Sequence, residues 1–288
     1  MENSFTLYKG CWLSKCPPHS SCYLKIDECG KLLNRGGYLL RNVYDWDCEH
    51  ETSFWFVIKD SFGGMEELSS KMRNQVKKSL KTYDVCRVSA SEMLRVGFPI
   101  FQVAVENYKV KATRITVDAF KTRIQQSEKA GNVDFWCVYT KETHKAVALA
   151  INTLHKDCCE YNTMKADPSY LRNSTYPYYG LIYEMNCYYL QELGFKYVSD
   201  GARSITEHSN IQSFLIDKFH FRKAYCQLQI VYQWWMKIAI GEFYQFNLSS
   251  CIRQQNSLTA QFVSFSLSNL ANIFYPPPIF TIINLCLL

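Results

Sequence analysis

A run of polar side chains follows a predicted strand in the second half of the chain and is suited to acid–base chemistry. The run reads Ser199-Asp200-Gly201-Ala202-Arg203-Ser204-Ile205-Thr206-Glu207-His208-Ser209-Asn210. Asp200 or His208 could act as a general base, because a positioned carboxylate accepts a proton and a histidine titrates near neutrality. Arg203 could bind a phosphate or carboxylate through two hydrogen bonds. Ser204 and Asn210 could orient a substrate, so we expect these five side chains to form a catalytic site.

The same run has a structural interpretation. Thr206, Ser209 or Asn210 could cap the helix that follows, and Glu207 would then lie near the positive end of that helix. Both interpretations place the run at the end of a strand, where open sheets hold their ligands. They stay open at the level of the sequence.

Two other segments are suited to a phosphate-bearing ligand. A helix predicted over 179–192 would present unpaired N–H groups at its start. There, Gly180 would allow close backbone approach, flanked by Tyr178 and Tyr179. The second segment is a helix predicted over 66–81, whose basic face is formed by Lys71, Arg73, Lys77 and Lys78. A solvated basic face is the alternative interpretation of that helix.

The order of elements over residues 134–232 must position these side chains. The pattern predicts strands over 134–139, 146–154 and 159–164, a helix over 179–192, a strand over 196–199, a helix over 209–218 and a strand over 223–233. The first three strands are joined by short connections and are expected to form an antiparallel meander. Tyr161 and Asn162 lie on the third strand, where they could face the reacting centre.

Earlier elements are predicted from their apolar periodicity. These are strands over 38–43, 54–59 and 86–88 and helices over 66–81, 99–109 and 116–129. Three regions follow from the change in composition along the chain. They are a turn-rich N-terminal segment with a first strand (1–50), a main domain (51–240, core 133–232), and a weakly ordered extension (241–288) in which Arg253 is the only charged side chain after Glu242.

Composition limits the classes of function. The chain has 288 residues and a net charge of +6, which permits an anionic ligand without requiring one. Its thirteen cysteines are scattered and form no Cys-x2-Cys pair, so we expect reduced thiols and no metal. No secretory signal is visible and no apolar run reaches about 18 residues, which predicts a cytoplasmic protein without a stable membrane span.

The element order resembles the core of the GCN5-related N-acetyltransferase (GNAT) superfamily, and most closely its bacterial Fem-type branch of aminoacyl- and acyltransferases. Three motifs carry the resemblance: the basic run Ser70-Lys71-Met72-Arg73-Asn74-Gln75-Val76-Lys77-Lys78, the helix end Tyr189-Leu190-Gln191-Glu192-Leu193-Gly194-Phe195, and the turn Asp200-Gly201. The resemblance covers about 50–240. It implies a mixed α+β fold with a central mixed sheet flanked by helices.

The resemblance also implies an enzyme that transfers an acyl or aminoacyl group by direct attack of an amine. The donor would be acyl-CoA (acetyl-CoA) or an aminoacyl-tRNA, without a metal and without DNA as a partner. The acceptor would be an amino sugar or peptide amine of a cell-envelope precursor. The alternative is a binding or scaffold protein that keeps the fold without catalysis. Residues 165–180 support that alternative, because Gly180 is the only glycine where acetyl-CoA enzymes carry a glycine-rich motif.

Overall fold

The computed structural model describes residues 4–107, 115–203 and 210–236. The chain divides into two compact units. The first comprises Met1–Phe54 and Tyr225–Leu288, and the second comprises Trp55–Ala224. Each unit is described by itself. The proposed extension 241–288 lies outside the described residues, and the predicted boundaries at 50 and 240 stay predictions.

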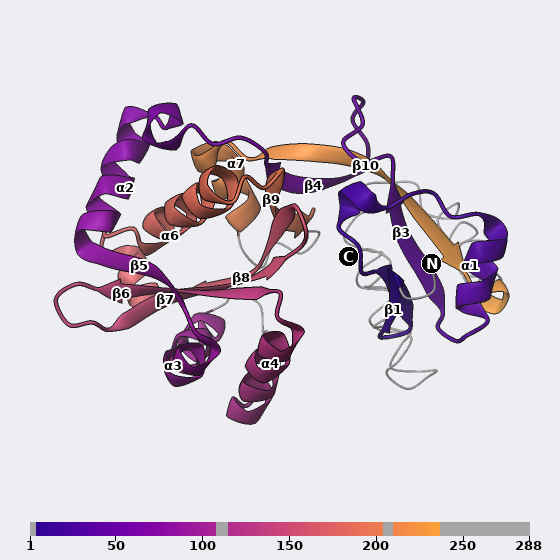
Figure 1. The fold of residues 1–288 in the computed structure, drawn as a ribbon, viewed down its shortest axis with the longest axis horizontal. Coiled ribbons are helices and arrows are strands. Elements are labelled where there is room, and N and C mark those ends of the chain that lie inside the picture. The colour runs from indigo at the N-terminus through magenta and orange to yellow at the C-terminus, as the bar shows by residue number, and fades with distance from the viewer. Residues whose placement is uncertain (1–3, 108–114, 204–209, 237–288) are drawn as a thin grey trace, which may run out of the picture. The chain divides into compact units, whose positions relative to one another are not determined.

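The second unit is built on a mixed sheet with helices on both faces (Figure 1). Its strands lie in the order β4 (Phe54–Lys59), β9 (Tyr197–Ala202), β8 (Cys158–Ala166), β7 (Ala146–Leu154), β6 (Val133–Thr140) and β5 (Tyr83–Val88). Neighbours are antiparallel except for β8 and β9, which are parallel. The predicted meander of three strands is therefore confirmed, and so is the mixed α+β class.

One face of this sheet is covered by α2 (Ser70–Thr82), α6 (Pro177–Asn186) and α7 (Ile211–Phe219). Val76, Leu181 and Phe219 bury their side chains in the core between these helices and the sheet. The predicted stripe on α2 accounts for its packing, because Met72 and Val76 lie on the inner side while the lysines stay outside.

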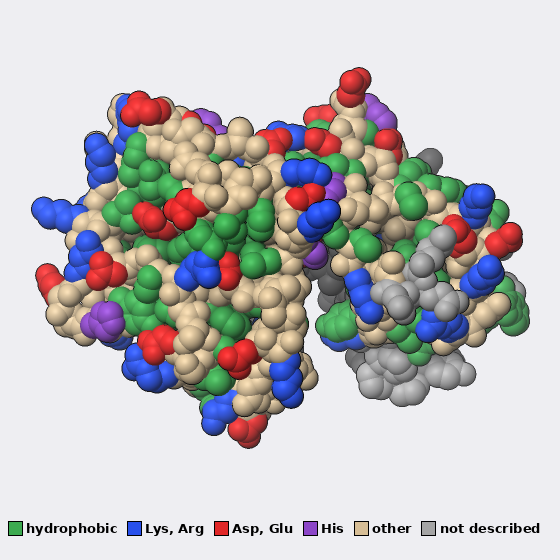
Figure 2. Space-filling view, viewed as in Figure 1, with side chains coloured by type: hydrophobic (Ala, Val, Ile, Leu, Met, Phe, Trp, Pro, Cys, Tyr) green, Lys and Arg blue, Asp and Glu red, His purple; other side chains and the backbone are tan. Residues whose placement is uncertain are grey.

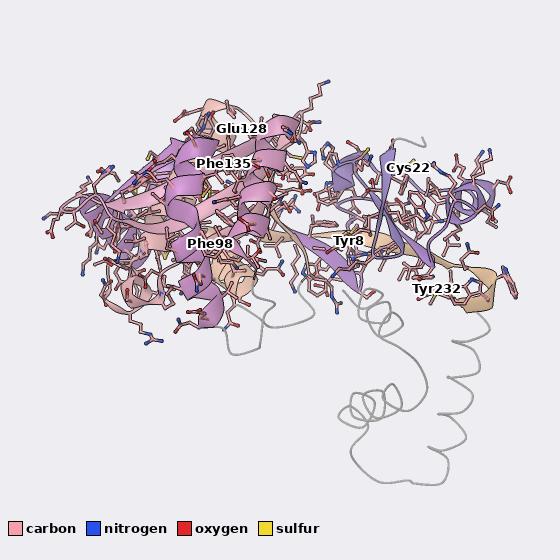
Figure 3. The ribbon with its side chains drawn as sticks, turned by 90° about the horizontal axis from the view of Figure 1, so that it is seen from below. Tyr8, Cys22, Phe98, Glu128, Phe135 and Tyr232 are labelled. Atoms are coloured by element: carbon pink, nitrogen blue, oxygen red, sulfur yellow. The ribbon has the colours of Figure 1, made fainter. Side chains whose placement is uncertain are left out.

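The opposite face is covered by α3 (Ala90–Glu106) and α4 (Val117–Ala130), which lie side by side in Figure 3, where Phe98 and Glu128 label them. Phe120 and Ile124 of α4 pack on Phe135 and Leu149 of the sheet. Gly131 ends α4 with a positive φ of 68°, as its position in the sequence predicted.

Several predicted boundaries were wrong for local reasons. The helix expected over 66–81 is broken: a 3₁₀ turn spans Gly64–Glu67, and α2 begins only after Ser69, whose side chain accepts from the Met72 N–H. The helix expected from residue 99 begins at Ala90, because Ser89 caps it and Pro99 is accommodated inside it.

The structure also differs from the predicted elements in the segment that follows the meander. The loop expected over 165–177 contains α5 (Pro168–Arg172), and the helix expected over 179–192 ends as a π-helical segment, Cys187–Glu192. The later elements, β9, α7 and β10, begin and end within a few residues of the predicted spans.

The first unit holds more regular structure than its turn-rich sequence suggested. It contains β1 (Phe5–Tyr8), β2 (Cys11–Ser14), α1 (Ile26–Leu33), β3 (Leu39–Tyr44) and most of β10 (Arg222–Tyr232). β1 pairs with β2 and β3 with β10 in antiparallel fashion, while β2 and β3 are parallel. Within the described residues, no helix combines the length and the apolar character needed to cross a membrane.

Candidate active site

The two parallel strands β8 and β9 separate after a short paired stretch. They pair only at Cys158 with Tyr197, Cys159 with Val198, and Glu160 with Ser199. β8 continues to Ala166 and β9 to Ala202. An unpaired length of two neighbouring strands leaves backbone groups and both strand faces accessible between them.

A β-bulge in β8 lies immediately after this separation. Ile151 of β7 pairs with Thr163 and Asn152 with Tyr161, so Asn162 is the extra residue. Because side chains alternate along a strand, this insertion places Tyr161 and Thr163 on opposite faces of the sheet. Tyr161 joins the core beneath α6, and Thr163 Oγ1 accepts a hydrogen bond from Arg123 of α4 at 3.0 Å.

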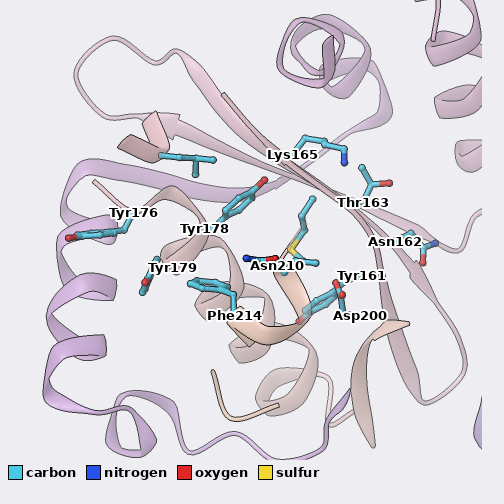
Figure 4. Close-up of a pocket in the computed structure, with 13 residues that line it drawn as sticks. Tyr161, Asn162, Thr163, Lys165, Tyr176, Tyr178, Tyr179, Asp200, Asn210 and Phe214 are labelled. Atoms are coloured by element: carbon cyan, nitrogen blue, oxygen red, sulfur yellow. The ribbon is translucent and has the colours of Figure 1, made fainter. Parts of the chain in front are cut away.

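A cavity of about 540 Å³ occupies the space between the separated strands (Figure 4). The cavity is lined by residues of β8, α5, the start of α6, β9 and the start of α7: Tyr161, Asn162, Thr163, Met164, Lys165, Leu171, Tyr176, Tyr178, Tyr179, Asp200, Asn210, Ile211 and Phe214. Tyr161 and Met164 belong to the α6 face of β8, whereas Thr163 and Lys165 belong to the α3–α4 face. The cavity is therefore reached by side chains from both faces of the sheet.

Asp200 is the titratable acid in this cavity. Burial raises the pKa of its carboxyl group from 3.8 to about 7, and a hydrogen bond from Gln212 opposes that shift. A carboxyl group with a pKa near neutrality can both accept and return a proton at physiological pH. Asn210 lines the same cavity and carries an amide group that could donate to a carbonyl oxygen. Asn162 also lines it, but one N–H group of its amide already donates to Thr153 Oγ1 at 2.5 Å, so a single N–H remains for a ligand.

The start of α6 differs from the phosphate site that its sequence suggested. Pro177 has no N–H group, the Tyr179 N–H donates to the Tyr176 carbonyl at 2.9 Å, and the Gly180 N–H donates to Ser79 Oγ at 3.1 Å. A Cβ atom at Gly180 would lie 2.6 Å from Ser79 Oγ. The glycine thus allows α6 to approach α2, and this helix start offers a phosphate fewer N–H groups than usual.

The basic face of α2 adjoins the cavity through Tyr176. Lys78 Nζ lies 5.8 Å from the centre of the Tyr176 ring. Hydrogen bonds from Gln75 and Ser174, followed by the charges of Lys78 and Lys71, lower the pKa of the Tyr176 phenol. Tyr176 adopts a left-handed backbone conformation, φ 59° and ψ 52°, which is costly for an aromatic residue and is maintained only by its surroundings. Figure 2 shows Lys and Arg side chains along the outer edge of α2.

The cavity brings together six residues that the sequence singled out: Asp200, Asn210, Tyr161, Asn162, Tyr178 and Tyr179. Asn210 precedes α7 but makes no side-chain cap there, contrary to the capping interpretation of that residue. Arg203 does not line the cavity, and its guanidinium lies 4.9 Å from the centre of the Trp55 ring. Ser204 and His208 lie outside the described residues, so their proposed roles stay predictions.

The remaining predicted ligand residues lie apart from the cavity wall. Gly180 is buried against α2, and Arg73 lies 4.0 Å from Glu66. Lys71 and Lys77 are exposed on α2. Sequence reasoning missed Thr163, Lys165 and Tyr176, and regular alternation along the third strand would have placed the first two on the same face as Tyr161, where the bulge does not put them.

Among the described residues, Asp45, Cys48 and His50 bring potential metal ligands within 4.8 Å of one another. None of these three side chains is buried, and exposed acidic groups gather in this way without a metal. We assign no ion to them.

The buried cysteines are poor nucleophiles. Burial raises the pKa of Cys158 to about 11 and that of Cys159 well above its ordinary value. We therefore expect iodoacetamide at pH 8 to label exposed Cys16 and Cys22 and to leave Cys158 and Cys159 unmodified until the protein unfolds. Peptide mass spectrometry of native and denatured samples measures this. Rapid native labelling of Cys158 would instead indicate a reactive thiol.

Comparisons with known proteins give structural neighbours only. No family model matches the chain, and no curated protein matches it by sequence. The chain is similar to FemX, with a TM-score of 0.48, 11% identity, and coverage of 70% of this chain and 68% of that chain. It is also similar to the C-terminal DUF2156 domain of a proposed lysylphosphatidylglycerol synthetase from Agrobacterium fabrum, with a TM-score of 0.47, 10% identity, and coverage of 83% and 82%. A third similar structure is L-PGS from Bacillus licheniformis, with a TM-score of 0.45, 8% identity, and coverage of 77% of this chain and 76% of that chain.

These scores are low, and the strand order of this chain is what establishes its fold class. That order is a meander, a helix and then a parallel strand that separates from its neighbour. The sequence predicted the meander, the helix and the following strand in this order, and the resemblance to the GNAT core implied a mixed sheet flanked by helices.

Proposed function

We propose that this chain transfers an acyl group from an activated donor to an amine, by direct attack and without a covalent intermediate on the protein. The observation that carries the proposal is the cavity, because it is reached from both faces of the sheet and holds a carboxyl group with a pKa near 7. Two substrates can then meet between β8 and β9, which is what acyl transfer between two bound molecules requires.

The proposed reaction exchanges a C–S or C–O bond of the donor for a C–N bond to the acceptor. The amine of the acceptor attacks the acyl carbon and forms a C–N bond, and the Asp200 carboxylate takes the proton that the nitrogen loses. The C–S bond of a thioester or the C–O bond of an ester then breaks, and the leaving sulfur or oxygen takes up the proton that Asp200 received, which returns Asp200 to its carboxylate form. Amide groups of Asn162 or Asn210 would stabilise the oxygen that becomes negative.

The donor is proposed to place its anionic part along α2. Two of the first N–H groups of α6 already have partners, so a phosphate chain must depend more on side-chain cations there. Lys71 and Lys78 adjoin the cavity through Tyr176. Of the two donor classes, acyl-CoA or an aminoacyl-tRNA, the second presents the longer run of phosphates to such a face. The acceptor is proposed to be an amino sugar or peptide amine of a cell-envelope precursor.

Thermal unfolding in the presence of acetyl-CoA, free CoA or aminoacyl-tRNA tests the proposal. A ligand at a hundred times its dissociation constant stabilises the folded state by about 2.7 kcal/mol. A higher melting temperature with acetyl-CoA and with CoA supports an acyl-CoA donor. A higher melting temperature with aminoacyl-tRNA alone supports the Fem-type donor. No shift with any of them would contradict the proposed transfer.

Charge reversal on α2 tests the assignment of the donor side. We expect Lys71→Glu combined with Lys78→Glu to weaken donor binding by about tenfold or more and to reduce its dependence on salt concentration, because each lost phosphate contact lowers the salt slope by about 1. Lys121→Glu combined with Lys129→Glu is the matched control, since both lysines are exposed on α4 on the other face of the sheet and the net charge changes equally. Equal weakening by the control would mean that only net charge matters.

A second function is favoured by one observation. Five aromatic rings line the cavity, those of Tyr161, Tyr176, Tyr178, Tyr179 and Phe214. Such a wall is also suited to holding an apolar ligand without reaction. The chain would then be a binding protein that keeps the transferase fold. Tight binding of a donor without turnover of any amine would support this function over transfer.

A further inference from the structure

The strand β9 contains a β-bulge at the residue that we propose as the general base. Two residues of β9, Asp200 and Gly201, lie opposite the single residue Val57 of β4. Gly201 has a φ of 84°, a left-handed conformation that glycine adopts at little steric cost. Bulges of this kind change the direction of a neighbouring side chain and are frequent beside active sites. The direction of the Asp200 side chain therefore depends on what holds this bulge.

Ser199 holds the bulge from within β9. Its side chain is buried, and its Oγ atom donates to the Val57 carbonyl at 3.3 Å. The same atom accepts a hydrogen bond from the Gly201 N–H at 3.0 Å. The N–H group of the bulge glycine thus has a partner inside the protein, as buried backbone groups require.

Gln212 holds the bulge from the neighbouring helix α7. Its Nε2 atom donates to the Ala202 carbonyl at 2.9 Å and lies 3.4 Å from the Asp200 carbonyl, so one amide spans the residues on both sides of Gly201. Gln212 also makes a side-chain hydrogen bond to Asp200 that lowers the pKa of the carboxyl group, against the larger effect of burial. A single side chain therefore contacts both the backbone and the acid group of Asp200.

Few other groups act on the ionisation of Asp200. Among the described residues, no charged side chain contributes to the shift of its pKa. The strand β4 brings only Val57 opposite the bulge, and Asp217 and Lys218 lie toward the far end of α7. Burial, followed by neighbouring groups that include Asp200, raises the pKa of the Tyr161 phenol on β8 well above its ordinary value (Figure 4). The other titratable residues that line the cavity are Lys165, Tyr176, Tyr178 and Tyr179.

We propose that Gln212 is a positioning residue for acyl transfer, because its amide holds the bulge of β9 and so directs the Asp200 carboxylate toward the amine of the acceptor. This inference rests on the proposed function, in which Asp200 takes the proton of that amine. Gln212 does not itself line the cavity and acts through Asp200. Its hydrogen bond also favours the ionised carboxylate, which is the form that can serve as a base.

Two substitutions of Gln212 test the inference. Gln212→Met keeps an unbranched side chain of similar length and removes the donors, and Gln212→Glu replaces the donors by a carboxyl group. Gln212 is only partly buried near the start of α7, so both variants are expected to fold. Gln125→Met is the matched control, because it makes the same change at an exposed residue of α4 on the other face of the sheet.

The first measurement is a pH titration of the ligand-free chain by NMR, with carbon-13 in the aspartate carboxyl groups. Asp200→Asn assigns the Asp200 resonance. The second is kcat/KM as a function of pH, with acetyl-CoA or aminoacyl-tRNA as the donor and glucosamine or glycylglycine amide as the amine. Melting temperatures are measured in parallel and report any general loss of stability.

Gln212→Met is expected to move the titration of Asp200 upward by about one pH unit, because a hydrogen bond to a charged group is lost. Gln212→Glu is expected to move it further, since a second carboxylate disfavours ionisation. The rising limb of kcat/KM should move with the titration, which lowers the rate at pH 6 by about tenfold or more in Gln212→Met. Gln125→Met should match the wild-type chain in both measurements.

An Asp200 titration that stays at its wild-type position in both variants overturns the inference, and so does a lower melting temperature without any change in that titration. Failure of the inference and failure of the proposed function remain separable. Acyl transfer with a wild-type pH profile in Gln212→Met would leave the transferase in place and remove Gln212 from it. A titration of Asp200 that depends on Gln212, in a chain that transfers no acyl group, would leave the effect of Gln212 on Asp200 in place and remove the transferase.

Discussion

Asp200→Asn is expected to lower kcat/KM for acyl transfer by about 10²- to 10⁴-fold, the contribution usually made by a positioned general base. The substitution keeps the size of the side chain and removes its capacity to take the amine proton. The wild-type rate is expected to rise with pH and to level off above an apparent pKa near 7, because burial raises the pKa of this carboxyl to about 7 and only the carboxylate is the base. The variant should lack this rising limb.

The same substitution has a stability signature that does not depend on activity. The pKa of Asp200 is raised from 3.8 to about 7 in the folded chain, so between these values the folded state binds more protons than the unfolded state. Stability contributed by this group is therefore present below pH 3.8 and is lost as the pH rises toward 7. Asp200→Asn should raise the melting temperature at pH 8 and leave it nearly unchanged at pH 3.5.

Asp84→Asn is the matched control for both measurements, because Asp84 is exposed on β5 and lies 3.6 Å from Lys141. It should preserve the pH profile of the rate and show no gain in melting temperature at pH 8. Wild-type kcat/KM in Asp200→Asn would remove this residue from the mechanism. The search for the base would then move to His208.

Elements with strong local patterns could be predicted from the sequence. The run of aromatic and β-branched residues at 54–59 and the long apolar run at 146–154 gave strands with the predicted bounds. The short strands Phe5–Tyr8 and Cys11–Ser14 could not be predicted in this way. Four residues are too few to establish a period. Phe5–Tyr8 pairs with Cys11–Ser14 across a short turn, and Cys11–Ser14 pairs in turn with β3, about 28 residues further along the chain, which no local pattern reveals.

The candidate site was predicted in its residues more than in its geometry. Asp200, Asn210, Tyr161 and Asn162 were expected to lie near one another and do line one cavity. The bulge that turns Thr163 to the other face could not be predicted, because an inserted residue depends on the register with β7 and leaves no local pattern.

Gly180 shows why a residue type alone does not define a role. A glycine at a helix start suggests close approach of a ligand, and only the position of α2 shows that the close approach is made by Ser79 instead. Its N–H group has a protein partner at 3.1 Å. The two interpretations make opposite predictions for the protein without ligand.

Gly180→Val is expected to destabilise the ligand-free chain by about 1–3 kcal/mol, the usual cost of overpacking, because a Cβ at this position would lie 2.6 Å from Ser79 Oγ and 3.3 Å from Ser79 Cβ. Gly30→Val is the matched control. Gly30 also lies within a helix, α1, and a Cβ there meets nothing within 4 Å, so valine should change stability by only a few tenths of a kcal/mol. Urea unfolding at equilibrium measures both variants.

If Gly180 instead makes room for a bound phosphate, Gly180→Val should leave the unfolding midpoint of the ligand-free chain unchanged and weaken only the binding of the donor. If it serves packing, the midpoint falls first, and any loss of donor binding follows from displacement of Tyr178 and Tyr179, which adjoin Gly180 and line the cavity. A second substitution separates these outcomes. Ser79→Gly removes the atoms that a valine would meet, so it should recover part of the stability lost in Gly180→Val, whereas a phosphate role for the glycine predicts no such recovery.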